Sequence, residues 1–277
     1  MKVSLSIVTY NTLIADLDKV LNSIKQTSQE WTLYIIDNSP NKELEKFFQD
    51  DKRIIYHFNN SNIGFGAGHN MAIELSLQAG FDFHFVVNPD IYFNEDIITP
   101  MINYINKNKD VGMMMPEVLF ASGEIQYLPK LLPSPFSILR RKLKWPKASF
   151  EKFICKYELR NVSRNEIIEV PILSGCFSLL NLKIIEEIGG YDEKFFMYFE
   201  DFDLSRRVHE KYKTLYFPKV SVYHGYESGA NKNLKLFKIF FSSAITYFNK
   251  WGWFFDHERD KINTTITKAL SLKSSTC

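Results

Sequence analysis

The sequence predicts an α/β protein with a mostly parallel central sheet and helices on both faces of that sheet. The chain has 277 residues, and 45% of them are apolar, which is enough to bury a large core. In the first half, short β-rich runs alternate with stretches of helical period, as βαβ units with right-handed crossovers require. Each β-rich run ends in polar or glycine-rich residues, and ligands bind at such strand ends in parallel sheets.

The elements of the first half follow from this alternation. After the first β-rich run, apolar residues recur at helical spacing, which indicates a helix; they are Leu13, Leu17, Val20, Leu21 and Ile24. The predicted strands are residues 3–10, 32–37, 54–58, 83–87 and 111–115, and the predicted helices are residues 13–24, a short polar helix near 42–49, and 70–78.

The second half is less regular. Residues 129–146 contain four prolines among basic residues, which predicts an irregular excursion. Regular structure resumes with a strand-like stretch at 167–180 and a short helix at 182–188 that stops at two glycines. A helix then begins within residues 195–207 and continues to about residue 213, and a strand follows at 215–224.

The charge of the chain is unevenly distributed. Residues 130–160 hold nine Lys and Arg residues against two Glu residues, whereas the remainder is net acidic. A basic face of this kind suits phosphate or an anionic membrane surface, and a solvated basic loop explains it equally well. Because the basic stretch is local, we expect no binding to nucleic acid.

The sequence also bears on the cellular compartment. Cys155, Cys176 and Cys277 are far apart and lack CxxC spacing, so neither a disulfide framework nor a zinc site is predicted. The apolar run at the N-terminus is too short for a signal peptide, and no stretch has the length and apolarity of a membrane-spanning helix. We therefore expect a cytoplasmic protein.

The sequence Asn88-Pro89-Asp90 follows the strand predicted at 83–87. A carboxylate at this position can hold Mg²⁺ or Mn²⁺ against a diphosphate, because hard cations bind oxygen ligands and the phosphates supply most of them. Asn-Pro-Asp is also good turn chemistry by itself, and these residues alone do not separate the two interpretations.

A glycine-rich loop, NNSNIGFGAGHN at residues 59–70, precedes the helix predicted at 70–78. Glycines let backbone approach a ligand closely, and a helix N-terminus favours anions. The spacing is not GxGxxG, which counts against a Rossmann dinucleotide site, and a P-loop sequence is absent. The alternative is that the glycines only make a tight turn.

Two further polar residues end predicted strands. Asp37 could accept hydrogen bonds from a nucleobase or ribose, or it could belong to a turn and helix cap. His224 could be a metal ligand, although a lone histidine is more often structural. In addition, residues 195–207, FFMYFEDFDLSRR, place three carboxylates among five aromatic residues, which helix capping alone could explain.

Taken together, these motifs resemble those of family-2 glycosyltransferases. SIVTYN, DNS, NxGFGxGxN, NPD and GGYDEKFFMYFEDFDLSRRV, followed by a strand that ends in His, occur in the order of that family from about residue 3 to residue 224. The likeness is greatest to the bacterial rhamnosyltransferase-like branch that builds O-antigen and capsule chains. It is specific for the family and weak for the particular sugar.

The resemblance implies a GT-A fold, which is a single Rossmann-like α/β domain, and a division of the chain. Residues 1–225 would form this domain, with a nucleotide-sugar-binding half at 1–115 and an acceptor-binding half at 116–225. Residues 226–277 would form a C-terminal amphipathic helical extension.

Position by position, the resemblance also implies a donor site. Asn88-Pro89-Asp90 occupies the place of the DXD motif, with Asp90 as the ligand of metal and diphosphate and His224 as a second metal ligand. Asn88 replaces the first acid of that motif, which leaves one charge fewer at the metal. The implied donor-binding residues are Thr9, Tyr10, Asn11, Asp37, Asn62, Gly64, Asn70, Asn88 and Asp90.

Glu200-Asp201 matches the ED motif of the family, and the resemblance implies that Asp201 is the catalytic base of an inverting transfer. An acceptor hydroxyl is a poor nucleophile until a positioned carboxylate takes its proton. Glu200 would orient the acceptor or interact with a helix N-terminus. Asp203 lies two residues beyond Asp201, so on a helix it points elsewhere, and it is expected to pair with Arg206 or Arg207.

The implied reaction moves a sugar from a nucleotide-diphosphate donor, dTDP-rhamnose or a UDP-hexose, to a saccharide acceptor that is lipid-linked, with Mg²⁺ or Mn²⁺. Residues 231–255 interleave lysines with aromatic residues, which is typical of a peripheral membrane segment on the inner face of the cell membrane. Packing of that segment on the core or on a second subunit, giving a homo-oligomer, is at least as good an explanation.

Two other classes remain as alternatives. A sugar nucleotidyltransferase shares the α/β architecture, but it usually carries a glycine-rich basic loop after the first strand, where this chain has Tyr10-Asn11-Thr12-Leu13. A catalytically impaired nucleotide-sugar-binding protein is the second alternative, and the Asn88 replacement is the feature that favours it.

Overall fold

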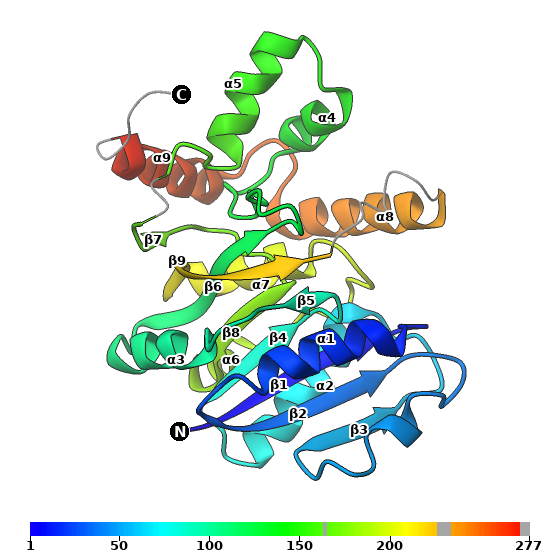
Figure 1. Ribbon diagram of the computed structural model, residues 1–277. Helices are drawn as coiled ribbons and strands as arrows, with labels where there is room; N and C mark the ends of the chain where they lie inside the picture. The colour runs from blue at the N-terminus through cyan, green and yellow to red at the C-terminus, as the bar shows by residue number, and fades with distance from the viewer. Residues whose placement is uncertain (163–164, 226–233, 272–277) are drawn as a thin grey trace.

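The computed structural model describes residues 1–162, 165–225 and 234–271. One sheet runs through these residues in the order β3-β2-β1-β4-β8-β6-β9-β5, and β7 pairs with β9 outside this path (Figure 1). Its strands are β1 (Lys2–Thr9), β2 (Glu30–Asp37), β3 (Ile54–Phe58), β4 (Phe83–Val87), β5 (Ile91–Tyr92), β6 (Val111–Leu119), β7 (Ile168–Glu169), β8 (Phe177–Asn181) and β9 (Lys213–His224).

The first four strands are parallel, and this part of the sheet carries the polar strand ends. β1 pairs in parallel with β2 over its whole length and with β4, and β2 pairs with β3. In the second half, β8 is antiparallel to both β4 and β6, and β6 is parallel to β9. The predicted parallel sheet is therefore present in the first half and mixed in the second.

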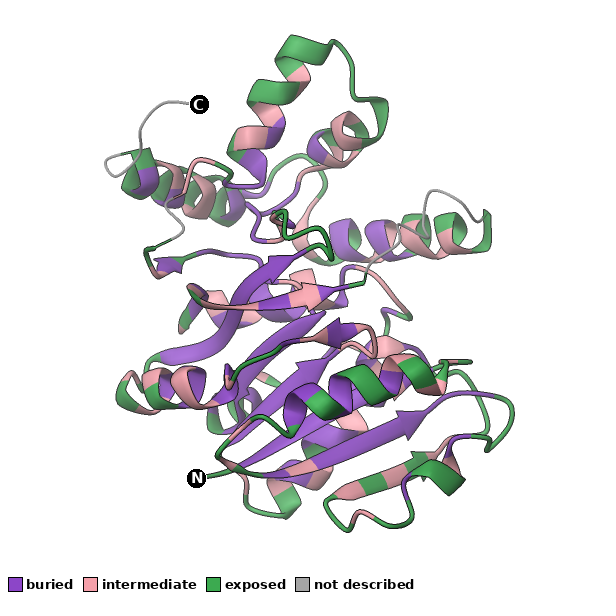
Figure 2. Cartoon of the chain, viewed as in Figure 1, coloured by how far each residue is buried: buried purple, intermediate pink, exposed green. Residues whose placement is uncertain are grey.

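Helices cover both faces of the sheet. Figure 1 shows α1 (Ile14–Ile24) in front of the strands and α2 (Phe65–Gln78) behind them. Strands β1, β2 and β4 are almost wholly buried between these layers, whereas the edge strand β3 is partly exposed (Figure 2). β4 and β6 are buried at every residue because both of their faces are covered. Helices α3 (Ile98–Lys107), α6 (Leu182–Ile188) and α7 (Glu200–His209) also lie in this part of the chain.

Several sequence predictions need correction. The polar helix expected near 42–49 is reduced to a single 3-10 turn, η1 (Glu45–Phe47). Helix α2 begins at Phe65 rather than near residue 70, so Gly66 and Gly68 belong to the helix. A Cβ at Gly68 would lie 2.7 Å from Val8 Cγ2, so this glycine is required because the helix lies close against β1. The helix of residues 195–207 is confined to α7 and ends at His209.

Residues 129–146 are not irregular throughout. Helix α4 (Pro135–Leu143) begins with a capping box between Ser134 and Ser137, with Pro135 in the first turn. Proline is favoured at this position because it has no N–H to leave unpaired. Pro146 is likewise the N-cap residue of α5 (Lys147–Tyr157). Two of the four prolines that indicated irregular chain, Pro135 and Pro146, therefore mark helix starts instead.

Two helices follow β9 in the chain, α8 (Leu234–Trp251) and α9 (His257–Ser271). Of the extension expected at residues 226–277, residues 226–233 and 272–277 lie outside the described residues. Within the described ranges, no helix combines the length and apolarity that a membrane crossing needs. Cys176 is a free buried thiol, whereas Cys155 is disulfide-bonded, which the cysteine spacing did not predict.

Candidate active site

The ends of β1 and β2 are joined by a buried carboxylate. Asp37 Oδ1 accepts hydrogen bonds from Thr9 Oγ1 at 3.0 Å and from the backbone N–H of Ser39 at 2.9 Å. Asp37 Oδ2 accepts a hydrogen bond from the hydroxyl of Tyr56 at 2.6 Å. Burial is the main cause that raises the pKa of Tyr56, and this hydrogen bond raises it further. Thr9 and Asp37 have no exposed surface, so their evident role is to hold the strand ends together.

The residues that follow β1 are open to solvent. Tyr10 is 50% exposed, and Asn11 is exposed with a positive φ of 52°. The backbone N–H of Asn11 donates to Ser39 Oγ at 2.8 Å, which fixes this turn on the end of β2. Of the residues expected at the nucleoside, Tyr10 and Asn11 are thus the accessible ones.

Asn38 connects the strand ends to the glycine-rich segment. Its side-chain amide donates to the carbonyl of Gly64 at 3.1 Å and accepts from Asn59 Nδ2 at 2.8 Å. Asn62 Oδ1 accepts from the backbone N–H of Gly64 at 3.1 Å. The segment that the sequence placed along the donor is therefore held by side-chain amides before it enters α2.

Gly64 also contacts the acidic motif. Its φ is 98°, and a Cβ at this position would overlap the carbonyl oxygen of Phe196, which accepts a hydrogen bond from Phe65 N at 2.9 Å. Tyr198 and Phe199, just before α7, have φ values of 71° and 66°. Consecutive left-handed non-glycine residues are costly, and such conformations cluster at functional sites.

Asn70 has a structural role. Its Oδ1 accepts from the backbone N–H of Tyr191 at 2.8 Å, and its Nδ2 donates to the carbonyl of Tyr191 at 2.9 Å and to Glu193 Oε1 at 3.0 Å. Both polar atoms of the Asn70 amide are therefore used to clamp α2 to the GGYDE stretch. This geometry favours positioning over the donor contact that the resemblance implied.

The NPD turn lies beside the end of β9. Asp90 Oδ1 is 3.3 Å from His224 Nε2, and Asn88 Nδ2 is 3.4 Å from the same nitrogen. Gln126, which the sequence analysis did not single out, contacts His224 Nδ1 through Oε1 at 3.1 Å. Its Nε2 donates to the carbonyls of His224 at 3.0 Å and Leu119 at 3.3 Å.

These bonds assign the imidazole tautomer. The two carbonyls fix the amide nitrogen of Gln126, so its oxygen faces His224 Nδ1, which must carry the proton. In neutral His224 the lone pair is then on Nε2, the nitrogen that faces Asp90. A neutral imidazole held by a neighbouring group in this way is the usual arrangement of a histidine metal ligand.

Asp90 and His224 fit a divalent cation. Two ligands about 2.1 Å from one octahedral ion lie about 3 Å apart, close to the 3.3 Å between Asp90 Oδ1 and His224 Nε2. The described residues contain no group of three or more His, Cys, Asp or Glu side chains that could hold a metal. Such a pair suits an ion that takes its remaining ligands from a diphosphate and water.

Glu200 and Asp201 begin α7 in different surroundings. Asp201 is partly exposed, and its oxygens accept from the backbone N–H groups of Phe202 at 2.9 Å and Gly175 at 3.2 Å. Burial raises the pKa of Asp201, while the bond from Gly175 and the charge of Lys130 oppose that rise. Burial and the charge of Asp201 raise the pKa of Glu200 well above its usual value.

The contrast separates the two acids. Glu200 is 6% exposed, and its Oε2 has no hydrogen-bond partner among the described residues. A carboxylate that accepts backbone N–H groups is stabilised in its charged form, whereas a buried one without donors is not. Burial therefore opposes the ionisation of Glu200 more strongly than that of Asp201, whose carboxylate accepts two backbone N–H groups.

One short segment joins this acid to the NPD turn. Gly175 donates to Asp201, and the carbonyl of the next residue, Cys176, accepts from the backbone N–H of Asn88 at 2.8 Å. Burial raises the pKa of the Cys176 thiol to about 12, with the charges of Asp90 and Asp201 contributing. Residues 174–176, which the sequence predicted as strand, are the link between the two groups of acids, and β8 begins only at Phe177.

Lys130 is a site residue that sequence reasoning missed. It is 7% exposed, and its Nζ donates to the carbonyl of Leu128 at 2.8 Å. Burial and the charge of Arg141 lower its pKa to about 8, while the negative charges of Glu158 and Asp201 act in the opposite direction. Lys130 lies in the basic stretch, where the sequence offered no signal that distinguished it from its neighbours.

Asp203 is structural, as expected. It is fully buried and pairs with Arg207 Nε at 2.8 Å, Lys250 Nζ at 2.7 Å and Trp251 Nε1 at 2.9 Å. The pairing with Arg207 confirms one of the two predicted partners. Arg206 pairs instead with Asp256, at 2.7 Å.

The aromatic residues before the acids pack against α8. Phe199 lies 5.3 Å from Phe240 and 5.4 Å from Tyr247, measured between ring centroids, and Ser243 Oγ donates to the carbonyl of Met197 at 2.8 Å. Phe195 and Phe199 are buried in this cluster, whereas Phe196 is 37% exposed. The main role of the aromatic residues in this stretch is thus to pack against α8.

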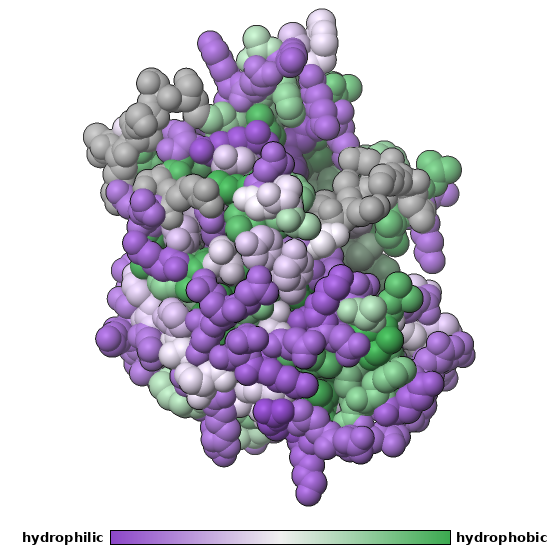
Figure 3. Space-filling view, viewed as in Figure 1, coloured by the Kyte–Doolittle hydropathy of each residue, from purple (hydrophilic) through white to green (hydrophobic). Residues whose placement is uncertain are grey.

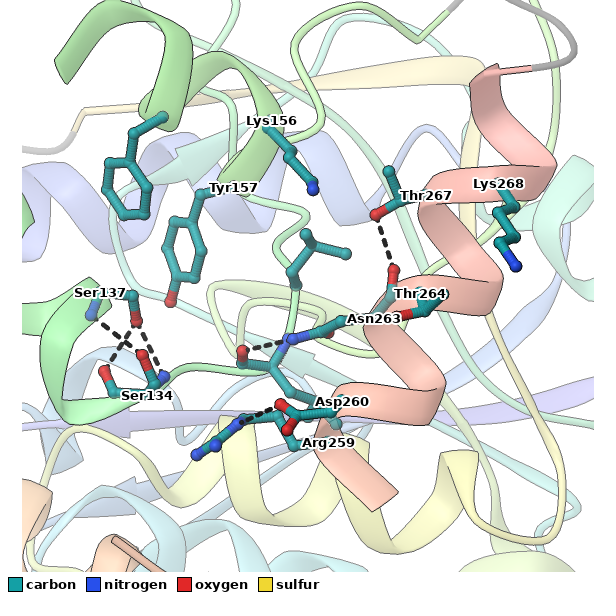
Figure 4. Close-up of a pocket in the computed structure, with 13 residues that line it drawn as sticks. Ser134, Ser137, Lys156, Tyr157, Arg259, Asp260, Asn263, Thr264, Thr267 and Lys268 are labelled. Carbon is teal, nitrogen blue, oxygen red and sulfur yellow. Dashed lines mark hydrogen bonds and ion pairs between the residues drawn. The ribbon is translucent and has the colours of Figure 1, made fainter. Parts of the chain in front are cut away.

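A cavity of about 450 Å³ lies elsewhere, between α4, α5 and α9. Figure 4 shows Ser134, Tyr157, Asn263 and Thr267 around it, and none of the acids described above lines it. Asn263 bonds the backbone of Leu132 in both directions, so this region joins α9 to the chain that enters α4.

The fold and the site together define a class of protein. The open α/β sheet, parallel in its first half and mixed in its second, has the GT-A fold of glycosyltransferases. A chain with this fold, GalNAc-T7 crystallised with UDP, GalNAc and Mn²⁺, superposes with a TM-score of 0.63 and 16% identity over 82% of this chain and 44% of the other.

The chain belongs to glycosyl transferase family 2, whose model matches residues 4–189. It is 25% identical over 179 residues to N-acetylglucosaminyl-diphospho-decaprenol L-rhamnosyltransferase of Mycobacterium tuberculosis, covering 59% of this chain and 56% of that protein. It is 23% identical over 196 residues to the rhamnosyltransferase WbbL of Escherichia coli, covering 69% of this chain and 71% of WbbL. The chain thus spans little more than half the length of the first relative.

Proposed function

We propose that the protein transfers a sugar from a nucleoside-diphosphate donor, dTDP-rhamnose or a UDP-hexose, to a lipid-linked saccharide, with inversion at the anomeric carbon. The reaction would belong to bacterial surface polysaccharide synthesis, as in O-antigen or capsule. The observation that carries this proposal is the segment 175–176, which bonds Asp201 on one side and the NPD turn on the other. A base and a diphosphate site joined in this way suit attack by an acceptor on a bound donor.

In this proposal residues 1–115 bind the donor. Tyr10 and Asn11 contact the nucleoside from their exposed turn, while Thr9 and Asp37 hold that turn in place from the interior. The backbone of Asn62 and Gly64 lies along the donor, and Asn70 keeps α2 against residues 191–193. Residues 116–225 provide the acceptor side with Asp201.

Asp90 and His224 would hold Mg²⁺ or Mn²⁺ with the diphosphate. A divalent cation bound there supplies charge neutralisation for the departing nucleoside diphosphate. Asn88 donates toward His224 and adds no charge, so the site depends on the single carboxylate of Asp90. The imidazole ligand favours Mn²⁺, because nitrogen ligands suit transition metals better than Mg²⁺.

Asp201 would take the proton of the acceptor hydroxyl as that oxygen attacks C1. Its partial exposure lets it reach a substrate, and its two backbone hydrogen bonds fix the orientation of the carboxylate. Lys130 helps to keep Asp201 ionised, because its positive charge lowers the pKa of Asp201. Neutral Glu200 would orient the acceptor at the start of α7.

The donor can be identified by thermal shift. We expect one of dTDP-rhamnose, UDP-galactose, UDP-glucose and GDP-mannose to raise the melting temperature, and Mn²⁺ to increase that shift. Slow metal-dependent hydrolysis of the same donor without acceptor would exclude the impaired sugar-binding protein. If no nucleotide sugar changed the melting temperature with or without Mn²⁺, the proposal would be wrong.

A further inference from the structure

Helix α4 presents an apolar stripe to solvent. Phe136, Leu139 and Leu143 follow one another at spacings of three and four residues, which places them on one side of the helix. They are 66%, 54% and 64% exposed, and Trp145, just beyond the helix, is 77% exposed. The opposite side of α4 faces inward through Ile138, which packs against the aromatic cluster of α8.

Helix α8 carries a similar stripe at its N-terminal end. Leu234, Phe237 and Phe241 have the same spacing and are 81%, 45% and 59% exposed, whereas Tyr247 and Phe248 of this helix are buried. Figure 3 shows apolar and charged residues side by side where this helix projects from the molecule. Both helices therefore bury one side and leave an apolar side open.

Helices α4 and α8 are neighbours, and Lys142, which lies between Leu139 and Leu143 in the sequence, reaches the stripe of α8. Lys142 on α4 places its Nζ 5.7 Å from the ring centroid of Phe237 and 4.7 Å from that of Phe240. We call the combined surface the α4–α8 face, formed by Phe136, Leu139, Leu143 and Trp145 with Leu234, Phe237 and Phe241. Soluble monomers rarely expose so many large apolar residues together without a partner for them.

The charge of this face specifies the partner. No Asp or Glu occurs in residues 125–150 or in residues 234–255. The basic residues of these two stretches that lie on or next to the two helices are Arg140, Arg141, Lys142, Lys144, Lys147, Lys235, Lys238 and Lys250. A second copy of the chain meeting this face symmetrically would bring these cations together, which is unfavourable.

An anionic lipid surface satisfies both features. Exposed Trp, Phe and Leu side chains enter the boundary between head groups and acyl chains, and Lys and Arg stay with the phosphates. We propose that the α4–α8 face docks the protein on the surface of an anionic bilayer. This inference deepens the proposed function and rests on it, because a lipid-linked acceptor is presented at such a surface.

The position of the face relative to the acids supports this role. The buried side of α8 packs on Phe199, the residue before Glu200, and Ser243 bonds the carbonyl of Met197. Lys250 and Trp251, at the other end of α8, bond Asp203 within α7. Docking through α8 would hold α7 and Asp201 in a fixed position above the lipid surface.

The test is flotation of the full-length protein with phosphatidylcholine vesicles, with and without phosphatidylglycerol. We expect co-flotation with the anionic vesicles that weakens as salt is added. Leu139→Ser, Leu143→Ser and Trp145→Ser combined should lower the partition coefficient about 100-fold or more, because three apolar side chains are lost. Lys142→Glu with Lys144→Glu should lower it about tenfold or more.

The matched control is Phe47→Ser with Ile55→Ser. These residues are 49% and 44% exposed near the opposite edge of the sheet, in η1 and β3, and their substitution should leave flotation unchanged. Melting temperature and donor hydrolysis report whether each variant is folded. Wild-type protein that stays unbound with anionic vesicles, or a dimer in solution that the triple variant abolishes, would overturn the proposal. Flotation without any sugar transfer would leave the face assigned and reject the proposed function.

Discussion

The indole nitrogen of Trp251 lies 2.9 Å from Asp203 Oδ1, and this hydrogen bond fastens the end of α8 to the helix that carries the two catalytic candidates. Asp203 has no exposed surface, and its charged partners are Arg207 and Lys250. The stability of α7 therefore depends on a tryptophan that lies 48 residues beyond Asp203 in the chain.

Trp251→Phe should lower the free energy of unfolding by about 1.5–3 kcal/mol, because a hydrogen bond to a buried carboxylate is lost while most of the ring packing is kept. Denaturant unfolding measures this change. The matched control is Trp253→Phe, which removes a bond to Asn249 at an exposed site and should change stability by at most about 0.5 kcal/mol. Equal effects of the two substitutions would show that the bond to Asp203 stabilises the fold no more than an exposed hydrogen bond does.

Asp201→Asn and Glu200→Gln should differ sharply in turnover. The first removes the base and should lower kcat by about 10²–10⁴-fold with little change in donor binding. The second replaces an acid whose pKa is raised by burial with an uncharged isostere, so kcat should stay within about tenfold of wild type. Steady-state kinetics with a saccharide acceptor distinguishes the two, and the opposite ranking would assign the base to Glu200.

Lys130→Met should change the pH dependence of the reaction. The base must be ionised, so activity is lost as the pH falls through the pKa of Asp201, which burial has raised. Removing the positive charge of Lys130 raises this pKa further, and the acidic limb of kcat/KM should move toward higher pH. Lys130→Arg keeps the charge and is the control. An acidic limb unchanged in Lys130→Met would mean that Lys130 does not act on Asp201.

Gln126→Leu tests the proposed metal site without substituting either of the two proposed metal ligands. Gln126 fixes the proton of His224 on Nδ1, and its loss should raise the Mn²⁺ concentration needed for half-maximal activity about 10–100-fold. His57→Ala, at an exposed position of β3, is the control and should leave the Mn²⁺ requirement unchanged. A Gln126→Leu enzyme with the wild-type Mn²⁺ requirement would remove His224 from the metal site.

The first half of the fold was predictable because its local signals agree. The runs that became β3 and β4 have the predicted bounds, since compact apolar segments between turn residues have few alternatives as structure. The prediction of an irregular segment at residues 129–146 was wrong because proline was interpreted as a helix breaker. Ser134 and Pro135 are a helix start, and their spacing to Ser137 was the signal available for it.

The candidate site was predictable only as a set of strand ends. Asp90 and His224 do meet, as the order of motifs suggested. Lys130 and Gln126 could not be found, because their importance depends on burial and on bonds to distant residues, which no local pattern records. Asn70 matched a motif, yet its amide serves the backbone of Tyr191, 121 residues away.

The contact between Gly64 and Phe196 restricts how this enzyme could be re-engineered. The glycine-rich segment and the acidic motif share a backbone hydrogen bond from Phe65 N to the carbonyl of Phe196, and no side chain fits at residue 64. A loop taken from a relative with another donor preference would have to be transplanted together with residues 190–199. A chimera that exchanges only one of these two segments should therefore fail to fold correctly.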